Sequence, residues 1–241
     1  MRQPRKPVTT DTPIVLDVAG DYACFTRPEA KAERISYPLI TPSAARGVLE
    51  AVFWKPEFEY RIRKVELLRP IRWFRIRRNE VSSAPALSTI QRQGADFRYD
   101  AAADRDQRFT LALRDVAYRI HADVALRPHA TDSLGKYVAQ ARRRIERGAC
   151  FSQPYLGCRE FSATDFGAAD PAVGPVPHDE YLGIMLLDVD HTIRPPRSTW
   201  FTAWLRQGVL DVPPEGIHDP ALDEQATTSP SIAAEAGRTC S

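Results

Sequence analysis

The sequence predicts an α+β fold, namely a ferredoxin-like domain followed by a small C-terminal antiparallel β-sheet appendage. Two segments place apolar residues at helical spacing, and several others alternate apolar and polar residues as strands do. These segments follow one another in the order strand, helix, strand, strand, helix, strand. That order is typical of a ferredoxin-like domain, which packs two helices on one face of an antiparallel sheet and leaves the other face open.

The first predicted strand and helix follow from short patterns near the N-terminus. Residues 14–19 are apolar and rich in β-branched side chains, and the Gly-Asp pair after them favours a turn. Further along, Thr41 suits a helix N-cap and Pro42 suits the first helical position, after which apolar residues recur at helical spacing. We therefore expect a strand that ends at Ala19 and a helix that begins at Pro42 and ends before Pro56.

The middle of the chain predicts two long strands joined by a polar segment. From Phe58, apolar and charged residues alternate, and the apolar phase shifts at Val65 as it does at a β-bulge. Residues 79–107 are polar and show little periodicity, so we expect a loop or a twisted hairpin tip there. Residues 109–126 should form the second long strand or hairpin arm, because they alternate again and contain a similar phase shift.

A second helix and a closing strand complete the predicted domain. The helix should begin near Asp132 or Ser133 and run to Arg147, because apolar residues recur at helical spacing and Gly148 favours its end. Residues 158–161 are the candidate closing strand. After a Pro/Gly/Ala linker, two further apolar stretches indicate a small β-hairpin.

The chain of 241 residues therefore has room for one full domain and a smaller appendage. We expect the ferredoxin-like domain to cover residues 1–161 and the C-terminal β appendage to cover residues 162–212. Residues 213–241 are acidic and nearly free of large apolar side chains, which predicts a flexible tail.

Composition excludes several classes of protein. The sequence contains no apolar run of the roughly 18 residues that a membrane span needs, and its basic N-terminus lacks the apolar core of a signal peptide. We therefore expect a soluble, cytoplasmic protein. The four cysteines form neither a C-x-x-C pair nor the spacing of a zinc site, so we expect reduced, mostly structural thiols, no metal site and no cofactor.

The formal net charge of +2 conceals a segregation of charge along the chain. Residues 55–147 contain 21 Lys and Arg against 12 Asp and Glu, whereas residues 162–241 contain 4 against 12. Arginine predominates in the basic region, and its planar guanidinium suits forked contacts with phosphate. The pattern favours a nucleic-acid surface in the middle of the chain, with a solvated basic face that has no partner as the alternative.

Several separated motifs carry a family resemblance that spans about residues 14–205. They resemble the d subtype of the Cas5 family of type I-C CRISPR-associated proteins. The motifs are GDYACFTRPE at residues 20–29, SYP at 36–38, TPSAARGVLEAVFWKP at 41–56, PI at 70–71, RRNEV at 77–81, LRDVAY at 113–118, GKY at 135–137 and PYLGCREF at 154–161.

The resemblance implies both a fold and an activity. It implies a ferredoxin-like, RRM-like domain of the RAMP superfamily, and a repeat-specific endoribonuclease that cuts precursor CRISPR RNA beside the repeat hairpin without a metal ion. Such a protein then stays on the 5′ handle of the guide RNA with the other subunits of the type I-C interference complex. The alternatives are a non-catalytic subunit that binds the 5′ handle, and a broader nucleic-acid binder that also accepts DNA.

The family's active site is a tyrosine, a lysine and a histidine, and the resemblance assigns only the lysine to a matching residue, Lys136. Phe53 stands at the position of the tyrosine and Tyr137 at that of the histidine. We expect Lys136 to stabilise the charge of a phosphorane formed by the substrate's own 2′-hydroxyl. Tyr137 either donates a hydrogen bond to that phosphorane or packs, and Phe53 either packs in the core or stacks on a base.

The missing tyrosine and histidine imply that another group handles the proton if the reaction persists. Four side chains offer this chemistry, but the sequence places none of them near Lys136: Tyr22, Tyr37, His121 and His129. The remaining contacts with RNA are expected to be phosphate contacts, which give affinity and register rather than sequence readout. The arginines predicted to make them are Arg46, Arg72, Arg75, Arg77, Arg78, Arg143 and Arg147.

Overall fold

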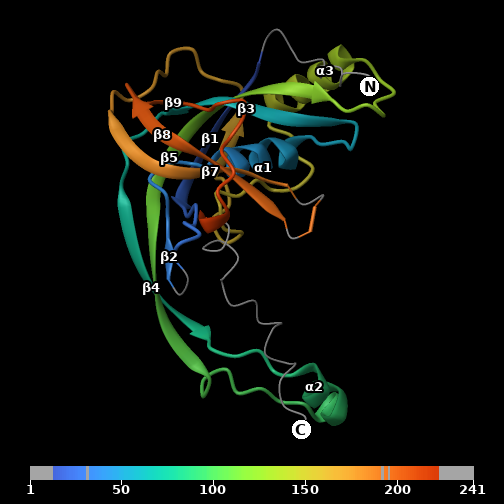
Figure 1. The fold of residues 1–241 in the computed structure, drawn as a ribbon, viewed down its shortest axis with the longest axis vertical. Helices are drawn as coiled ribbons and strands as arrows, with labels where there is room; N and C mark the ends of the chain where they lie inside the picture. The colour runs from blue at the N-terminus through green and yellow to red at the C-terminus, as the bar shows by residue number, and fades with distance from the viewer. Residues whose placement is uncertain (1–12, 31–32, 191–192, 195, 223–241) are drawn as a thin grey trace.

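The computed structural model describes residues 13–30, 33–190, 193–194 and 196–222. Within these residues the chain forms a mostly antiparallel sheet of nine strands, three α-helices and one short 3₁₀ helix (Figure 1). The elements are β1 (Ile14–Ala23), β2 (Arg34–Ile35), α1 (Pro42–Val52), β3 (Phe58–Leu67), β4 (Trp73–Val81), α2 (Leu87–Gln93), the 3₁₀ helix (Gly94–Asp96), β5 (Arg105–Leu126), α3 (Leu134–Glu146), β6 (Asp165–Gly167), β7 (Glu180–Asp190), β8 (Arg197–Arg206) and β9 (Val209–Asp211).

Strand β5 organises the sheet. Its 22 residues pair with β4 over the first half and with β1 and β3 over the second. The main path through the sheet runs β6-β1-β5-β3-β9-β8-β7, and β2 and β4 join β5 outside this path. The two predicted phase shifts are confirmed, because the β3–β5 register shifts between Ile62 and Lys64 and Asp115 interrupts β5 with a positive φ of 53°.

Helices α1 and α3 form as the sequence predicts. The Thr41 hydroxyl accepts a hydrogen bond from Ala44 N at 3.3 Å, and Pro42 takes the first turn, where a missing N–H costs nothing. Helix α1 ends at Val52, before the predicted limit at Pro56. Helix α3 ends at Glu146, and Gly148 follows it with a positive φ of 59°.

Both helices bury their apolar stripes against the sheet. Helix α1 packs on β3 and β7, and α3 packs on β5 and β1. The buried side chains of the two helices include Val48, Leu49, Val138, Ala141 and Ile145. They share one core with the inward residues of β1, which fixes the solvent-facing side of α3.

Two of the predicted elements are placed wrongly, and two observed elements were not predicted. Strand β1 continues past Gly20 to Ala23 because β5 pairs with it along this whole stretch, so Gly20 lies within a strand rather than in a turn. Residues 158–161 form a turn closed by a bond from Phe161 N to Cys158 O, and the strand that pairs with β1 on this side is β6. Strand β4 and helix α2 have no counterpart in the predicted elements.

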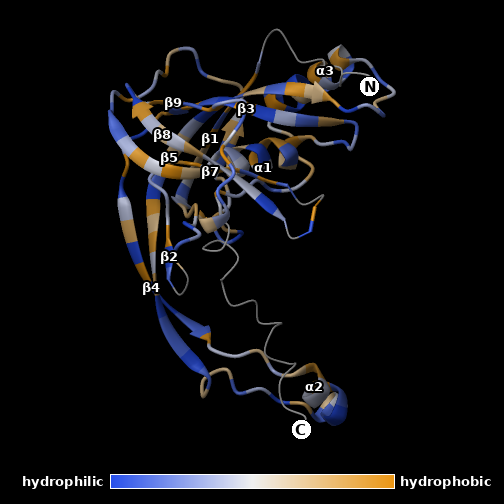
Figure 2. Cartoon of the chain, viewed as in Figure 1, coloured by the Kyte–Doolittle hydropathy of each residue, from blue (hydrophilic) through white to orange (hydrophobic). Residues whose placement is uncertain are grey.

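Strand β4 and the first part of β5 form a long hairpin that projects from the body, with α2 at its tip (Figure 1). We call residues 73–113 the arm. Hydrophilic residues prevail where the two strands leave the body (Figure 2). No residue of α2 is buried, so the arm's far end adds little to the core.

The C-terminal strands extend the same sheet. Strands β7 and β8 form the predicted hairpin, and β9 pairs with both β8 and β3. A domain boundary between residues 161 and 162 therefore stays a prediction. Within the predicted tail, Ile217 exchanges two backbone hydrogen bonds with Trp200, while residues 223–241 lie outside the described residues. None of the helices described here is long and apolar enough to cross a membrane.

Candidate nucleic-acid interface

Lys136 lies in the first turn of α3 on the solvent side. Its side chain is 61% exposed, and its Nζ donates to Asp132 Oδ1 at 2.8 Å. This hydrogen bond and the charge of Asp132 raise the pKa of Lys136, so the amine stays protonated near neutral pH. The backbone N–H groups of the same helix end favour an anion, which makes this a suitable place for a phosphate.

Three aromatic rings connect the end of α1 to the start of α3. The ring centroids of Phe53 and Phe58 lie 5.6 Å apart, and those of Phe58 and Tyr137 lie 5.2 Å apart. All three rings belong to the core, since Phe53 is 3% exposed and Tyr137 is 1% exposed. This contact chain holds the loop after α1 beside the loop before α3.

The burial of these rings corrects two expectations. Phe53 fills core space under the guanidinium of Arg144, which lies 5.4 Å from its ring, so it is not placed to stack on a base. The hydroxyl of Tyr137 is buried and has no hydrogen-bond partner among the described residues, so it is not placed to reach a phosphorane. Both Phe53 and Tyr137 pack in the core, which was the other role expected for each of them.

Of the four side chains offered as a replacement acid or base, His129 alone lies beside these two loops. Its Nε2 is 3.0 Å from the carbonyl oxygen of Pro56, and the bond from Arg127 N to Glu57 O at 2.8 Å ties the same two loops together. The His129 side chain is exposed. The two bonded residues are 73 positions apart in the chain, so no local pattern could have shown this proximity.

The other three candidates lie elsewhere. Tyr22 packs against Phe74 at the base of the arm, and Tyr37 is buried, which raises its pKa to about 12. His121 lies on β5 with Nε2 at 2.9 Å from Glu66 Oε1, and burial lowers its pKa. None of these three positions belongs to the loops around Lys136.

Two exposed aromatic side chains lie at the end of α1. Trp54 follows α1 and is 50% exposed, and Phe151 is 85% exposed. The backbone N–H of Phe151 donates to Ala51 O at 2.9 Å, which holds this aromatic residue against the end of α1. We call the following set the α3 surface: Trp54, His129, Lys136, Arg143, Arg147 and Phe151.

Arg46 is engaged by carboxylates within the protein. Its guanidinium makes two parallel bonds of 2.7 Å to the carboxylate of Asp188 and lies 3.8 Å from Glu50. The forked pair links α1 to β7, on which the helix packs. Both outer nitrogens of the guanidinium already have a carboxylate partner, and the phosphate contact of Arg46 stays a prediction.

The four predicted arginines near the base of the arm divide into two groups. Arg75 and Arg77 are exposed along one face of β4, and Arg77 lies 5.3 Å from the Phe109 ring. Arg72 instead binds Asp115 at 2.8 Å, and Arg78 binds Glu160 at 2.7 Å. The sequence cannot distinguish these groups, because the carboxylates lie far from the arginines along the chain.

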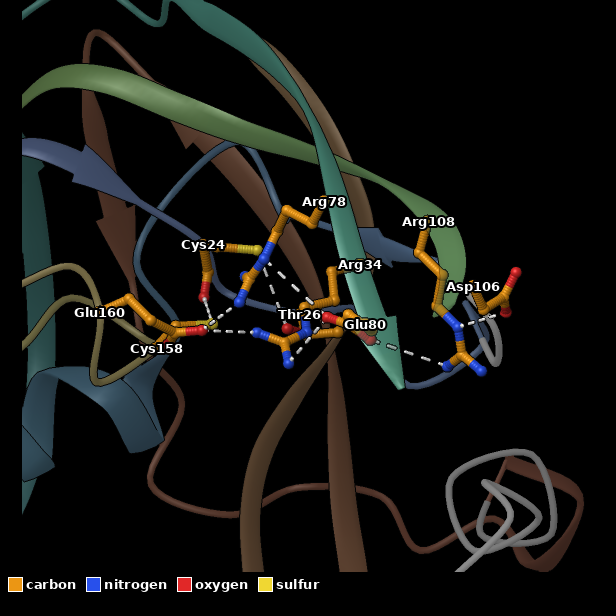
Figure 3. Close-up of polar contacts among 9 residues, drawn as sticks. All are labelled: Cys24, Thr26, Arg34, Arg78, Glu80, Asp106, Arg108, Cys158 and Glu160. Atoms are coloured by element: carbon orange, nitrogen blue, oxygen red, sulfur yellow. Dashed lines mark hydrogen bonds and ion pairs between the residues drawn. The ribbon is translucent and has the colours of Figure 1, made fainter. Parts of the chain in front are cut away.

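Figure 3 shows Arg34 and Arg78 converging on Glu160 at the base of the arm. The hydrogen bond from Arg78 is the main cause that lowers the pKa of Glu160 to about 2, and the bond from Arg34 adds to it. Glu80 on β4 extends the network to Arg34 at 3.4 Å. The network therefore joins β2, β4 and the loop that carries Glu160.

A cysteine pair adjoins this network. Cys158 Sγ lies 3.5 Å from Cys24 O (Figure 3). The backbone of Gly157 packs against the same carbonyl. A hydrogen bond from the Cys24 thiol lowers the pKa of Cys158 to about 6, with the nearby charge of Arg34 acting in the same direction. The bond to Cys158 and burial raise the pKa of Cys24.

We expect iodoacetamide to label Cys158 faster than the buried Cys24. The labelling rate should rise as pH increases through about 6, because the thiolate is the reactive form. Mass spectrometry of peptides from protein labelled between pH 5 and 9 measures this directly, with Cys158→Ser as the control that removes the signal. A rate that rises only above pH ~8, as for an ordinary thiol, would contradict the expectation.

Comparison with known proteins shows which family the chain belongs to. A family model described as CRISPR-associated protein (Cas_Cas5), of the Cas5d group, matches residues 13–224. Two proteins named CRISPR pre-crRNA endoribonuclease Cas5d are similar over most of their length. The one from Thermus thermophilus is 44% identical, covering 84% of this chain and 92% of the relative. The one from Mannheimia succiniciproducens is 41% identical, covering 83% and 95%.

A solved structure titled Crystal Structure of CRISPR-associated Protein shares the fold. Its TM-score is 0.62 at 20% identity, and the match covers 86% of this chain and 94% of that one. The antiparallel sheet and its helices are thus found in a second protein. The resemblance predicted from the separated motifs is confirmed, and the chain belongs to the Cas5d family of CRISPR-associated proteins.

Proposed function

We propose that this protein is a repeat-specific, metal-independent endoribonuclease that cleaves precursor CRISPR RNA beside the repeat hairpin. The observation that carries the proposal is the identity of 44% and 41% with proteins named CRISPR pre-crRNA endoribonuclease Cas5d, over more than nine-tenths of their length. After cleavage the protein stays on the 5′ handle of the guide RNA as a subunit of the type I-C interference complex, in the prokaryotic cytoplasm where the transcript is made.

The strand order supports a ferredoxin-like, RRM-like fold of the RAMP superfamily as part of this proposal. Strands β1, β3, β5 and β6 alternate with α1 and α3 as the β-α-β-β-α-β motif requires. They lie side by side in the order β6-β1-β5-β3, so the first and third strands of the motif are central. This arrangement puts α3 and the loop after α1 on the same end of the sheet.

The α3 surface suits the binding of an RNA strand beside a hairpin. Lys136, Arg143 and Arg147 provide charge for phosphates along one side of α3. Trp54 and Phe151 present exposed rings on which unpaired bases can stack. Charge fixes the position of the backbone, and the rings favour single-stranded nucleotides over paired ones.

In the proposed reaction the 2′-hydroxyl attacks the neighbouring phosphorus, and the 5′-oxygen of the next nucleotide leaves. Lys136 offsets the extra negative charge on the phosphorane, and the N–H groups at the start of α3 add to this effect. The products are one RNA end with a 2′,3′-cyclic phosphate and one with a 5′-hydroxyl.

Cleavage of a labelled repeat hairpin by the purified protein in excess chelator tests the proposal. We expect a single fragment that carries a 2′,3′-cyclic phosphate, and no fragment when a 2′-deoxy nucleotide stands at the cut site. Binding without any fragment would instead support the non-catalytic 5′-handle subunit, which the burial of Phe53 and Tyr137 favours. Equal competition by unrelated DNA across a salt titration would support the broader nucleic-acid binder.

A further inference from the structure

The proposed reaction needs a group that accepts the proton of the 2′-hydroxyl, and the positions used by the family do not provide one. Phe53 has no ionisable group, and the Tyr137 hydroxyl is buried. Lys136 carries a proton near neutral pH because Asp132 raises its pKa, so it is a cation rather than a base. Among the other side chains of the α3 surface, the imidazole of His129 has the chemistry of a proton acceptor.

We propose that His129 is the catalytic base of this protein. The inference rests on the proposed endoribonuclease function and adds the residue that removes the 2′-hydroxyl proton. His129 lies in the loop just before α3, three residues ahead of Asp132, whose carboxylate holds Lys136 at 2.8 Å. It also touches the loop after α1 through Pro56, two residues beyond the exposed Trp54.

The hydrogen bond to Pro56 prepares the ring for this role. A backbone carbonyl can only accept, so Nε2 is the nitrogen that carries the hydrogen and donates to Pro56 O at 3.0 Å. In the neutral ring Nδ1 then keeps its lone pair, and it has no hydrogen-bond partner among the residues that the structure describes. The carbonyl thus selects the tautomer and orients the imidazole, as second partners of functional histidines do.

The surroundings of His129 are balanced in charge. Imidazole is the side chain that enzymes most often use as a general base. Cations and anions of the neighbouring segments come in nearly equal number, so neither sign dominates there. These groups are Lys55 and Glu57 on the loop after α1, Arg127 on the loop of His129, and Asp132 and Lys136 at the start of α3.

The step balances without any further reactant. Nδ1 of His129 takes the proton as the O2′–H bond breaks and O2′ bonds to phosphorus, and the P–O5′ bond then breaks. The departing O5′ takes a proton from solvent, and His129 later releases its proton to solvent. Nothing is oxidised or reduced, and no metal or cofactor enters the step.

The test compares single-turnover cleavage by the wild type, His129→Ala, His129→Gln and the control His178→Gln, which changes an exposed histidine paired with Glu180. Both His129 variants should cleave at least about 100-fold more slowly, while the control keeps the wild-type rate. The wild-type rate should rise with pH and then level off, and the His129 variants should lose this inflection. Added imidazole should restore part of the rate of His129→Ala.

A substrate with a 5′-thio leaving group separates the two possible proton roles. Sulfur leaves without protonation, so a general acid becomes dispensable and a general base does not. We expect the His129 variants to stay defective on this substrate. If the His129 variants recover wild-type rates on the 5′-thio substrate, or keep the wild-type rate and pH profile on ordinary RNA, the assignment of His129 is overturned. If the wild type cleaves no repeat RNA at all, the proposed function itself is overturned. Melting curves and RNA affinity, measured alongside, exclude loss of fold as the cause.

Discussion

Replacing Lys136 by alanine should lower the single-turnover cleavage rate about 100-fold, while the affinity for repeat RNA changes by less than about threefold. The side chain is exposed and its partner is the neighbouring Asp132, so its loss leaves the core intact. The rate depends on it because the phosphorane carries more charge than the bound substrate, and a cation at the start of α3 stabilises that added charge. Rates and affinities come from labelled repeat hairpin in excess chelator.

Arg142→Ala provides the matched control, because it removes one positive charge from the exposed part of the same helix. The cleavage rate of Arg142→Ala should stay within about threefold of the wild type. Salt screens the electrostatic effect of one exposed charge that does not contact the reacting phosphate. Lys136→Arg should retain more activity than Lys136→Ala, because it keeps the charge. Equal losses in Lys136→Ala and Arg142→Ala would contradict a specific role for Lys136.

Gly157→Ala should be the most destabilising conservative substitution in the loop that carries Cys158. Gly157 has a φ of +88°, and a Cβ added to it would lie 2.0 Å from the carbonyl oxygen of Cys24. Both the strained backbone and the contact with another backbone atom oppose a side chain, so we expect a loss of more than about 3 kcal/mol in the free energy of unfolding. Urea denaturation followed by fluorescence measures this loss.

Gly47→Ala is the control for this experiment. Gly47 lies within α1, and a Cβ there would meet no atom within 4 Å. Alanine should therefore raise the free energy of unfolding by about 0.5–1 kcal/mol, because glycine is the poorer helix former. Similar unfolding midpoints for Gly157→Ala and Gly47→Ala would refute the close packing of Gly157 on Cys24.

Helices and strands with a clear sequence pattern could be predicted from the sequence. Elements whose conformation depends on contacts with distant residues could not. Helix α1 carries its own cap at Thr41, and β3 and β5 alternate clearly. Strand β4 was missed because its less exposed face includes Arg78 and Glu80, which are satisfied by Glu160 and Arg108 rather than by apolar neighbours. Its strand conformation follows from its pairing with β5.

The candidate site shows the same division. The position of Lys136 on the solvent side of α3 follows from helical spacing alone. The structural role of Arg46 depends on Asp188, which is 142 residues away in the chain. The placement of His129 depends on the carbonyl of Pro56, which is 73 residues away. Charge and residue type suggested phosphate contacts for all the arginines, but only the tertiary partners separate those engaged by carboxylates from those that remain available.

The position of β5 in the chain also has a consequence for biosynthesis. Among the described strands, β1 pairs only with β5 and β6, and both are made much later than β1 itself. At a usual rate of translation, the apolar residues of β1 leave the ribosome roughly 5–20 s before their first partner exists. During that interval Ile14, Leu16 and Val18, which are buried in the folded protein, lack the strands that pair with β1, so we expect this segment to need protection from aggregation.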